Sequence, residues 1–310
     1  DLYGPAHIGE CKVTADRNGK LTSYEYNGWQ HNWSNVETSE QLTGVASAEW
    51  PGFAAQGPSV QNCGSMYAVA NLKVVSHKLP HQGWLRAGWL RSPLDLSFSF
   101  ASEQAIDQLA YELGQDPYEF RLKNMTDERW LGVLNAAAQA AKWTPRKAHA
   151  NPSNANVVRG RGIGLGTHLQ SWGGAVAEIE VDRKTGKVRI VHLYGSLDAG
   201  QVVNPRIVEA QIMGQLVQTT GRMLYEEVKF TPQGVTTLDW NSYPVARFND
   251  VPEITPIVVQ RLDKPSSGAG EETMAAAAAA IANAFFDATG VRMEEYPFTP
   301  ARVLGALNKK

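Results

Sequence analysis

Residues 266–280 are Ser-Ser-Gly-Ala-Gly-Glu-Glu-Thr-Met followed by six alanines. Glycine and alanine let a backbone pass close to a bulky neighbour, because no larger side chain stands in the way. The two carboxylates, Glu271 and Glu272, stand where a helix is expected to begin, and the positive end of a helix dipole favours negative charge. This pattern is typical of a base positioned beside a large ligand, and equally of an ordinary helix start with acid in its first turn.

Working outward, residues 273–289 are apolar on nearly every side and end at Gly290, which predicts a fully buried helix. Four further helices are expected from apolar periodicity and terminal signals. These signals include Gly114 after one helix and Asn204-Pro205 at the start of another. The expected helices span residues 103–113, 118–123, 126–142 and 205–224.

Two stretches predict β-hairpins, because β-rich segments flank a polar turn that contains glycine. They pair residues 8–14 with 21–26 and residues 175–181 with 188–194. Between them, residues 143–166 are rich in Pro, Asn, Ser and Gly and predict a link at a domain boundary. Its glycines at 160, 162, 164 and 166 lack the strand-then-helix setting of a phosphate-binding loop, which favours a glycine-rich strand or connector.

Composition excludes several classes of protein. With 310 residues and 43% hydrophobic content, the chain can bury a substantial core and is expected to hold two domains. A net charge of −2 without a basic stripe argues against nucleic-acid binding, and no apolar run is long enough to span a bilayer. Cys11 and Cys63 are the only cysteines, so a zinc site or an iron–sulfur cluster held by this chain alone is not expected.

The polar residues show few catalytic patterns. No Gly-x-Ser-x-Gly elbow occurs, and the seven histidines are scattered, so each is expected to be a surface or core histidine rather than a ligand. Gln211, Gln215 and Gln218 share one helix face, which could bind a polar ligand or simply face solvent. Arg91, close to Trp89 and Pro93, suits an anion or a flat heterocycle, or an aromatic-rich connection at an interface.

In order along the chain, these pieces resemble the molybdopterin-binding large subunit of the xanthine dehydrogenase/aldehyde oxidase family, in its isoquinoline oxidoreductase and nicotinate dehydrogenase branch. The resemblance covers nearly the whole chain. It rests on these ordered blocks: Arg91-Ser92-Pro93, Ala101-Ser102-Glu103, residues 117–124, Asp198-Ala199-Gly200, Asn204-Pro205, residues 211–214, Gly268-Ala269-Gly270-Glu271, residues 280–284, residues 288–292 and residues 299–304.

This resemblance implies an α+β fold with mixed sheets and packed helices, divided into residues 1–145 and 146–310, the second domain carrying the catalytic glutamate. It further implies that Glu271 is the general base and that Gln211, Arg91 and the loop of Ser266, Ser267, Gly268, Ala269 and Gly270 contact the cofactor. Pro93 and Trp89 would border the substrate. Molybdenum would be held by the pterin and by no side chain of this chain.

The family also implies partners and a reaction. The cofactor would be molybdopterin, in its cytosine dinucleotide form, and a [2Fe-2S] subunit would take up the electrons, with a cytochrome c or flavin acceptor beyond it. The substrate would be an aldehyde or an electron-poor N-heterocycle, hydroxylated with oxygen from water. The compartment would be the bacterial cytoplasm, or the periplasm or inner membrane through a partner.

The chain departs from the family in two missing motifs and at two single positions. Its Gly-Gly-Gly-Phe-Gly stretch and Gly-Gln-Gly loop do not occur, and the chain opens at Asp1 without Met, so we expect a C-terminal half that needs a complementary half. Leu94 replaces a usual glycine, and Glu272 replaces a proline that often follows the base.

The alternative to a catalytic half of such an enzyme is a non-catalytic structural half-subunit. A nicotinamide-dependent dehydrogenase is disfavoured because no strand–GxGxxG–helix unit occurs.

Overall fold

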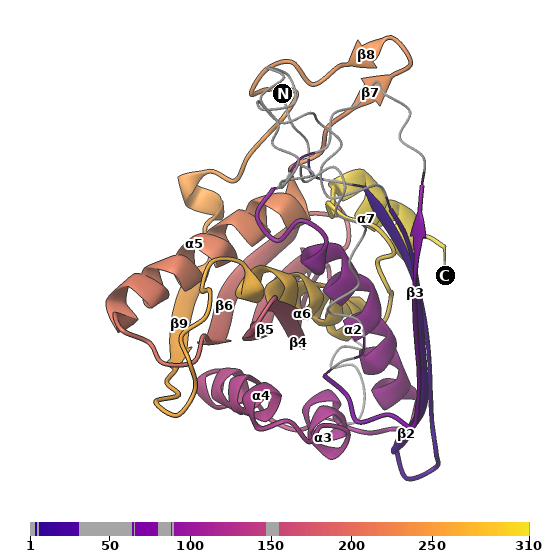
Figure 1. The fold of residues 1–310 in the computed structure, drawn as a ribbon. Helices are drawn as coiled ribbons and strands as arrows, with labels where there is room; N and C mark the ends of the chain where they lie inside the picture. Colours follow the sequence, from indigo (N-terminus) through magenta and orange to yellow (C-terminus); the bar gives the residue numbers. More distant parts are fainter. Residues whose placement is uncertain are drawn as a thin grey trace.

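The computed structural model describes residues 6–30, 66–79, 90–146 and 155–309, together with Gly4, Gly64 and Gly88. Two mixed sheets and several packed helices form an α+β fold, as the sequence predicted (Figure 1). The first sheet has the order β1-β2-β3, with β1 and β2 antiparallel and β3 parallel to β2. Its strands are β1 (His7–Ala15), β2 (Leu21–Gln30) and β3 (Asn71–Lys78).

The second sheet has the order β4-β5-β6-β9, in which β9 runs parallel to β6 and the other neighbours are antiparallel. Both predicted hairpins are confirmed, as β1–β2 and β5–β6. The strands are β4 (Val157–His168), β5 (Ser171–Asp182), β6 (Val188–Asp198) and β9 (Glu253–Val259), and a separate ribbon pairs β7 (Phe230–Thr231) with β8 (Gly234–Val235).

The five predicted helices are confirmed, with some differences at their ends, whereas a short helix at residues 300–307 and a 3₁₀ turn at residues 248–250 were not predicted. The helices are α2 (Asp95–Glu112), α3 (Pro117–Lys123), α4 (Glu128–Ala140), α5 (Pro205–Leu224), α6 (Glu272–Thr289), α7 (Pro300–Leu307) and the 3₁₀ turn η2 (Phe248–Asp250). Helix α2 begins eight residues earlier than expected. Its added turns lie between two hydrophobic cores, since Leu96 and Phe100 pack in one and Phe98 in the other.

Residues 157–166 of the predicted link lie in strand β4, which confirms the strand alternative for the glycine-rich run over the connector. The alternate glycines of β4 face helix α6 directly. A Cβ added to Gly162 would lie 2.2 Å from the Ala280 carbonyl oxygen and 2.2 Å from the Ala284 nitrogen. At Gly160 it would lie 2.1 Å from the Ala284 oxygen. Glycine is therefore required here because the helix backbone occupies the space of a side chain.

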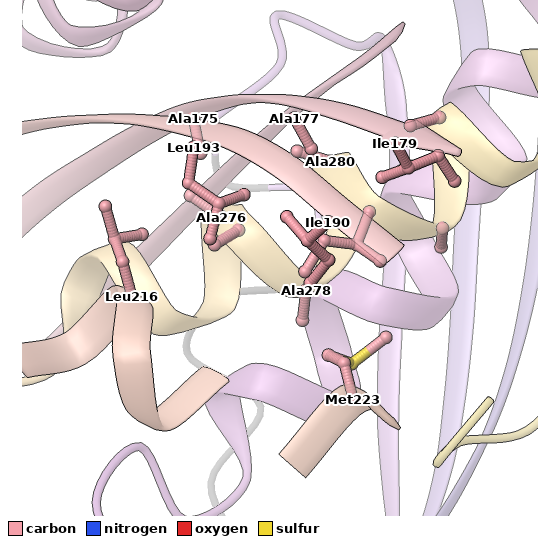
Figure 2. Packing of buried hydrophobic residues seen from close by; sticks show 14 of the residues in the cluster. Ala175, Ala177, Ile179, Ile190, Leu193, Leu216, Met223, Ala276, Ala278 and Ala280 are labelled. Carbon is pink, nitrogen blue, oxygen red and sulfur yellow. The ribbon is translucent and has the colours of Figure 1, made fainter. Parts of the chain in front are cut away.

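Every residue of α6 is buried, which confirms the prediction from its apolar sequence. Its alanines pack against the second sheet, where Ala276, Ala278 and Ala280 lie close to side chains of β5, β6 and α5 (Figure 2). Small residues on both sides let the helix and the strands approach closely, and this close approach builds the larger core.

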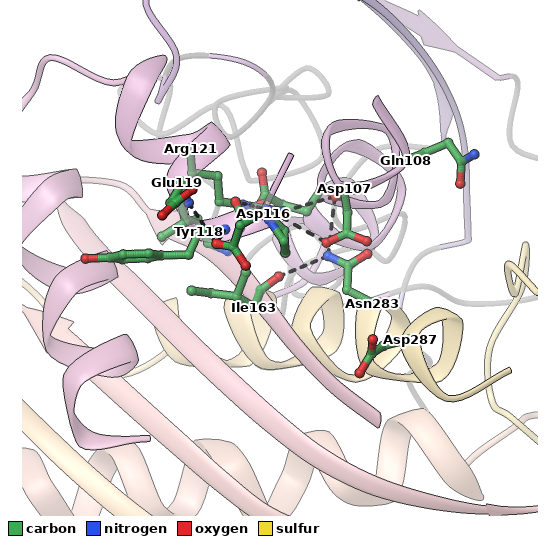
Figure 3. Close-up of polar contacts among 12 residues, drawn as sticks. Asp107, Gln108, Asp116, Tyr118, Glu119, Arg121, Ile163, Asn283 and Asp287 are labelled. Atoms are coloured by element: carbon green, nitrogen blue, oxygen red, sulfur yellow. Dashed lines mark hydrogen bonds and ion pairs between the residues drawn. The ribbon is translucent and has the colours of Figure 1, made fainter. Parts of the chain in front are cut away.

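A buried polar network fixes α6 along its length. Arg121 is fully buried and donates to Glu103, with Nε 3.0 Å from Oε2. Arg292 bridges Asp107 and Asn283, and the Asn283 amide donates to the Ile163 carbonyl of β4 at 3.0 Å (Figure 3). Because a buried charge without its partner is costly, this network sets the register of α6 against β4.

The division at residues 145 and 146 stays a prediction. Each of the two hydrophobic cores draws residues from both sides of that point: Leu96 joins the core of the second sheet, and Ile163 joins the core of the first. Over the described part of the chain, none of the helices has the length and apolar character needed to cross a membrane.

Candidate functional site

The loop of residues 266–270 connects the end of β9 to the start of α6, and short polar contacts hold it in place. The Ser267 amide donates to the Ala199 carbonyl at 2.9 Å, and the Ser266 hydroxyl donates to the Gln201 carbonyl. The Ser171 hydroxyl lies 2.8 Å from the Ser267 hydroxyl and donates to the Gly268 carbonyl at 2.5 Å. The loop therefore has a defined position before any ligand arrives.

Gln215 on α5 is fully buried and fastens the second half of this loop. Its Nε2 donates to the Ala269 carbonyl at 3.0 Å, and its Oε1 accepts from both the amide and the hydroxyl of Thr273 at 2.7 Å. The sequence predicted that Gln215 shares a polar helix face with Gln211 and Gln218, but it predicted no separate role for Gln215. Its role depends on contacts with residues more than fifty positions away.

Arg91 and Gln211, both predicted cofactor contacts, lie together at the edge of the loop. Arg91 Nε donates to the Gly270 carbonyl at 2.5 Å, and its Nη2 donates to Gln211 Oε1 at 2.8 Å. Burial lowers the pKa of Arg91, while the charges of Glu271 and Glu272 oppose that shift. The structure thus brings a guanidinium and an exposed amide to the same rim.

Glu271, the predicted base, directly precedes α6, and its side chain is 28% exposed. Its Oε2 accepts a hydrogen bond from the Ser92 amide at 3.0 Å. Ser92 has a φ of 61°, a left-handed conformation that is uncommon for a residue with a side chain. Such strained backbone gathers at functional sites, and here it aims an amide at the carboxylate.

Glu272, noted as a departure from the family, is buried more deeply than Glu271. It is 1% exposed, and its Oε2 accepts from the Glu271 amide at 2.9 Å. Burial raises its pKa to about 7, although the backbone hydrogen bonds at the helix start act in the opposite direction. Glu272 therefore serves the start of α6, and Glu271 is the carboxylate that faces outward.

The remaining predicted residues lie nearby or outside the described chain. Pro93 is buried two residues before α2, and Leu94 is 2% exposed in the first sheet's core, so this second departure from the family is a packing residue. Trp89 lies outside the described residues, so its predicted place beside the substrate stays a prediction.

Sequence reasoning missed His168 and Asp95. His168 ends β4, and its Nδ1 lies 2.6 Å from Asp95 Oδ2 while its Nε2 lies 3.3 Å from Glu271 Oε2. The hydrogen bond and charge of Asp95, together with the charge of Glu271, raise the pKa of His168 against the lowering effect of burial. The three residues are far apart in the sequence, so no local pattern could have joined them.

Ligand atoms of Asp95, His168 and Glu271 all lie within 4.8 Å of one another, a spacing that a metal ion could bridge. However, two ligands at about 2.0 Å from a tetrahedral zinc ion lie about 3.3 Å apart. The 2.6 Å separation of His168 Nδ1 from Asp95 Oδ2 is instead that of a hydrogen bond. The arrangement is that of an oriented histidine between two carboxylates.

The rim of the site has room for a large ligand. Among the described residues, a Cβ added to Gly270 would meet no atom within 4 Å, and one added to Gly268 would meet only Glu272 Oε1 at 3.7 Å. The Ser92 hydroxyl is buried, and among the described residues it has no hydrogen-bond partner. An open loop, a cation and an unpaired hydroxyl fit a bulky polar ligand with negative charge, such as a phosphate-bearing pterin.

Comparison with known families matches the chain to two models, each described as a molybdopterin cofactor-binding domain. One covers residues 3–125 and the other residues 168–252. Together they include Arg91, Asp95, His168 and Gln211, whereas Glu271 and its loop lie beyond the second match.

Curated relatives agree with these matches. The chain is 39% identical over 72% of its length to a nicotinate dehydrogenase component of Pseudomonas putida. It is 28% identical over 99% of its length to a membrane-bound, pyrroloquinoline-quinone aldehyde dehydrogenase of Gluconacetobacter polyoxogenes, and 30% identical over 65% to the beta chain of isoquinoline 1-oxidoreductase of Brevundimonas diminuta. The aligned regions span only 20%, 41% and 25% of those proteins.

A solved structure shares the fold. The aldehyde oxidoreductase of Desulfovibrio desulfuricans matches 98% of this chain with a TM-score of 0.76 at 17% sequence identity, and the match covers 49% of that protein. At this identity the match concerns the fold alone.

Proposed function

This chain belongs to the xanthine dehydrogenase/aldehyde oxidase family, and from that membership we propose that it forms part of a molybdenum hydroxylase. The complete enzyme oxidises an aldehyde or hydroxylates an electron-poor N-heterocycle with oxygen from water. The observation that carries the proposal is the position of Glu271. Its carboxylate, fixed by the Ser92 amide, lies beside an open loop of small residues.

The cofactor contacts come from the rim of this site. Arg91, Gln211 and the loop of residues 266–270 hold molybdopterin, since they offer a cation, an amide and a backbone that a bulky group can approach. When bound, the molybdenum cofactor supplies the oxygen-transfer and electron-accepting chemistry. The cytosine dinucleotide form of the cofactor is part of the proposal.

Glu271 acts as the general base. It removes the proton from the oxygen nucleophile, which then attacks the electron-poor carbon of the substrate. A base must be within hydrogen-bond reach and held in one orientation, and the Ser92 amide supplies that orientation. Pro93 and Trp89 border the substrate.

The test of this assignment is Glu271→Gln in the assembled enzyme. Glutamine keeps an oxygen that can accept from the Ser92 amide but cannot take up the proton. Turnover should fall by about 100-fold or more while the molybdenum content stays unchanged. Full activity in this variant would show that Glu271 is not the base.

Electrons must leave through a partner. The whole sequence has two cysteines, whereas a [2Fe-2S] cluster needs four protein ligands. We therefore include a [2Fe-2S] subunit in the proposal, with a cytochrome c or flavin acceptor beyond it. Iron analysis and the visible spectrum of the purified complex test this.

A complementary half is expected to cover the exposed apolar side chains between residues 203 and 262. Large apolar side chains that stand exposed are candidates for burial by a partner chain. Trp240 is 75% exposed and Phe248 is 96% exposed. Charged replacements at both positions should weaken assembly in co-purification, whereas Val157→Glu, at the exposed start of β4, serves as the control.

The alternative, a non-catalytic half-subunit, makes a different prediction. In that case, the complex assembled from the other chains would hold its full molybdenum content without this chain, and Glu271→Gln would be active. A substrate screen of the intact complex, comparing aldehydes with pyridines and quinolines, then identifies the substrate class.

A further inference from the structure

His168 stands between two carboxylates that come from different elements. Asp95 lies in the first turn of α2, and Glu271 directly precedes α6. His168 itself is the last residue of β4 and pairs with Ser171 across a two-residue turn. The tight packing of β4 on α6 fixes the backbone that leads to His168, and the contact of Nδ1 with Asp95 Oδ2 orients the imidazole.

The hydrogen bonds determine which ring nitrogen carries the proton. An ionised carboxylate only accepts, and Asp95 lies at a helix N-terminus, where negative charge is favoured. Since Asp95 Oδ2 lies 2.6 Å from Nδ1, that nitrogen holds the hydrogen in the neutral ring. Nε2 is then a free acceptor, 3.3 Å from Glu271 Oε2.

We propose that His168, oriented by Asp95, is a positioning residue for Glu271 and accepts the proton that Glu271 removes from the nucleophile. This inference rests on the proposed function. The O–H bond at Glu271 Oε2 breaks and an N–H bond forms at His168 Nε2. Glu271 returns to its ionised form, and no electrons are transferred. The imidazolium then releases its proton to solvent, since the His168 side chain is 20% exposed.

The charges around His168 favour this transfer. Three carboxyl groups contribute, namely Asp95 from α2 and Glu271 and Glu272 from the start of α6, while Arg91 carries the opposing charge near Glu271 and Glu272. Their net negative charge stabilises the imidazolium, which agrees with the raised pKa of His168. Neutral His168 is the acceptor, so turnover should rise with pH through that pKa.

The first test is independent of turnover. In the full chain labelled with ¹³C-histidine, NMR titration should give a His168 pKa above the ordinary value of 6.5. The pKa should fall in Asp95→Asn and again in Glu271→Gln, because each removes a negative charge. A pKa that moves in neither variant would overturn the proposed coupling.

The second test uses the assembled enzyme. In His168→Gln, kcat should fall about tenfold or more with KM and molybdenum content unchanged, and the rise of kcat with pH should disappear. Added imidazole should restore turnover to His168→Ala. The matched control is His192→Gln, since His192 also pairs with a carboxylate, Glu253, but lies in the interior of β6, two strands away from β4.

The outcomes separate the two proposals. Wild-type kcat in His168→Gln, together with an inactive Glu271→Gln, overturns the role of His168 and leaves the proposed function standing. Loss of molybdenum in His168→Gln and also in Asp95→Asn would show that the pair supports binding, and would overturn the proton-transfer role. Full activity in Glu271→Gln overturns the proposed function itself.

Discussion

Glycines lie next to helix α6 in two regions, along its length and at its N-terminal end. Along its length they belong to β4, where an added Cβ would lie 2.1 to 2.6 Å from atoms of α6. At its N-terminal end they belong to the loop of residues 266–270, where a Cβ on Gly270 would meet no atom of the described part of the chain within 4 Å. The same residue type therefore allows the core to close in one region and keeps space free for a ligand in the other.

Among the variants that test this contrast, Gly162→Ala should cause the largest loss of stability. Its Cβ would collide with backbone atoms of Ala280 and Ala284, which cannot rotate away as a side chain could. We expect a loss of stability at the upper end of the overpacking range, about 3 kcal/mol or more, measured by urea unfolding. Gly305→Ala in α7, where a Cβ meets nothing within 4 Å, should not destabilise the chain.

Glu272 is the first residue of α6, where the two regions meet. Glu272→Gln tests how this residue makes the stability of the chain depend on pH. Burial raises the pKa of Glu272 from 4.5 to about 7, so between these values the native state holds a proton that the unfolded chain has lost. Stability from this group is therefore greatest below pH 4.5 and falls as pH rises through 7. The full shift corresponds to an upper limit of about 3 kcal/mol, and structural relaxation makes it smaller.

In Glu272→Gln this fall with pH should be absent. The measurement is the free energy of unfolding of both proteins at several pH values, with Glu294→Gln as the control for loss of an exposed carboxylate. Parallel pH curves for the wild type and Glu272→Gln would contradict the assignment.

Gly270→Ala should have the smallest effect on stability, within about 0.5 kcal/mol, since the methyl group points into open space. The same methyl group should obstruct the cofactor, so we expect the molybdenum content of the assembled enzyme to fall. A Gly270→Ala variant that is clearly less stable but keeps its full molybdenum content would contradict the contrast between Gly270 and Gly162.

Much of the fold could be predicted because its signals are local. The apolar stretch of α6, the Asn204-Pro205 start of α5 and the polar turns of the two hairpins all specify structure within a few residues. The alternate glycines of β4 favoured a strand or a connector but could not decide between them, because glycine has low strand propensity on its own. They form a strand only because α6, more than a hundred residues later, packs against them.

The residues of the site also fall into two groups, those with a local sequence signal and those without one. Glu271, its loop, Gln211 and Arg91 followed from ordered motifs, and the structure brings them to one rim. His168 and Asp95 carry no local signal, since a single histidine among seven resembles any other in the sequence. Gln215 likewise becomes informative only when the Ala269 carbonyl and Thr273 are placed against it.

The late position of α6 in the chain has a consequence for biosynthesis. Domains generally fold as they emerge from the ribosome, with N-terminal parts first. Here β4 emerges long before α6, the helix that fills the space above its glycines and begins at the site. Until residues 272–289 have been synthesised, that face of the sheet stays uncovered and the site lacks one wall. Loading of a cofactor must therefore follow the completion of α6, which makes loading a step that comes after translation of this segment.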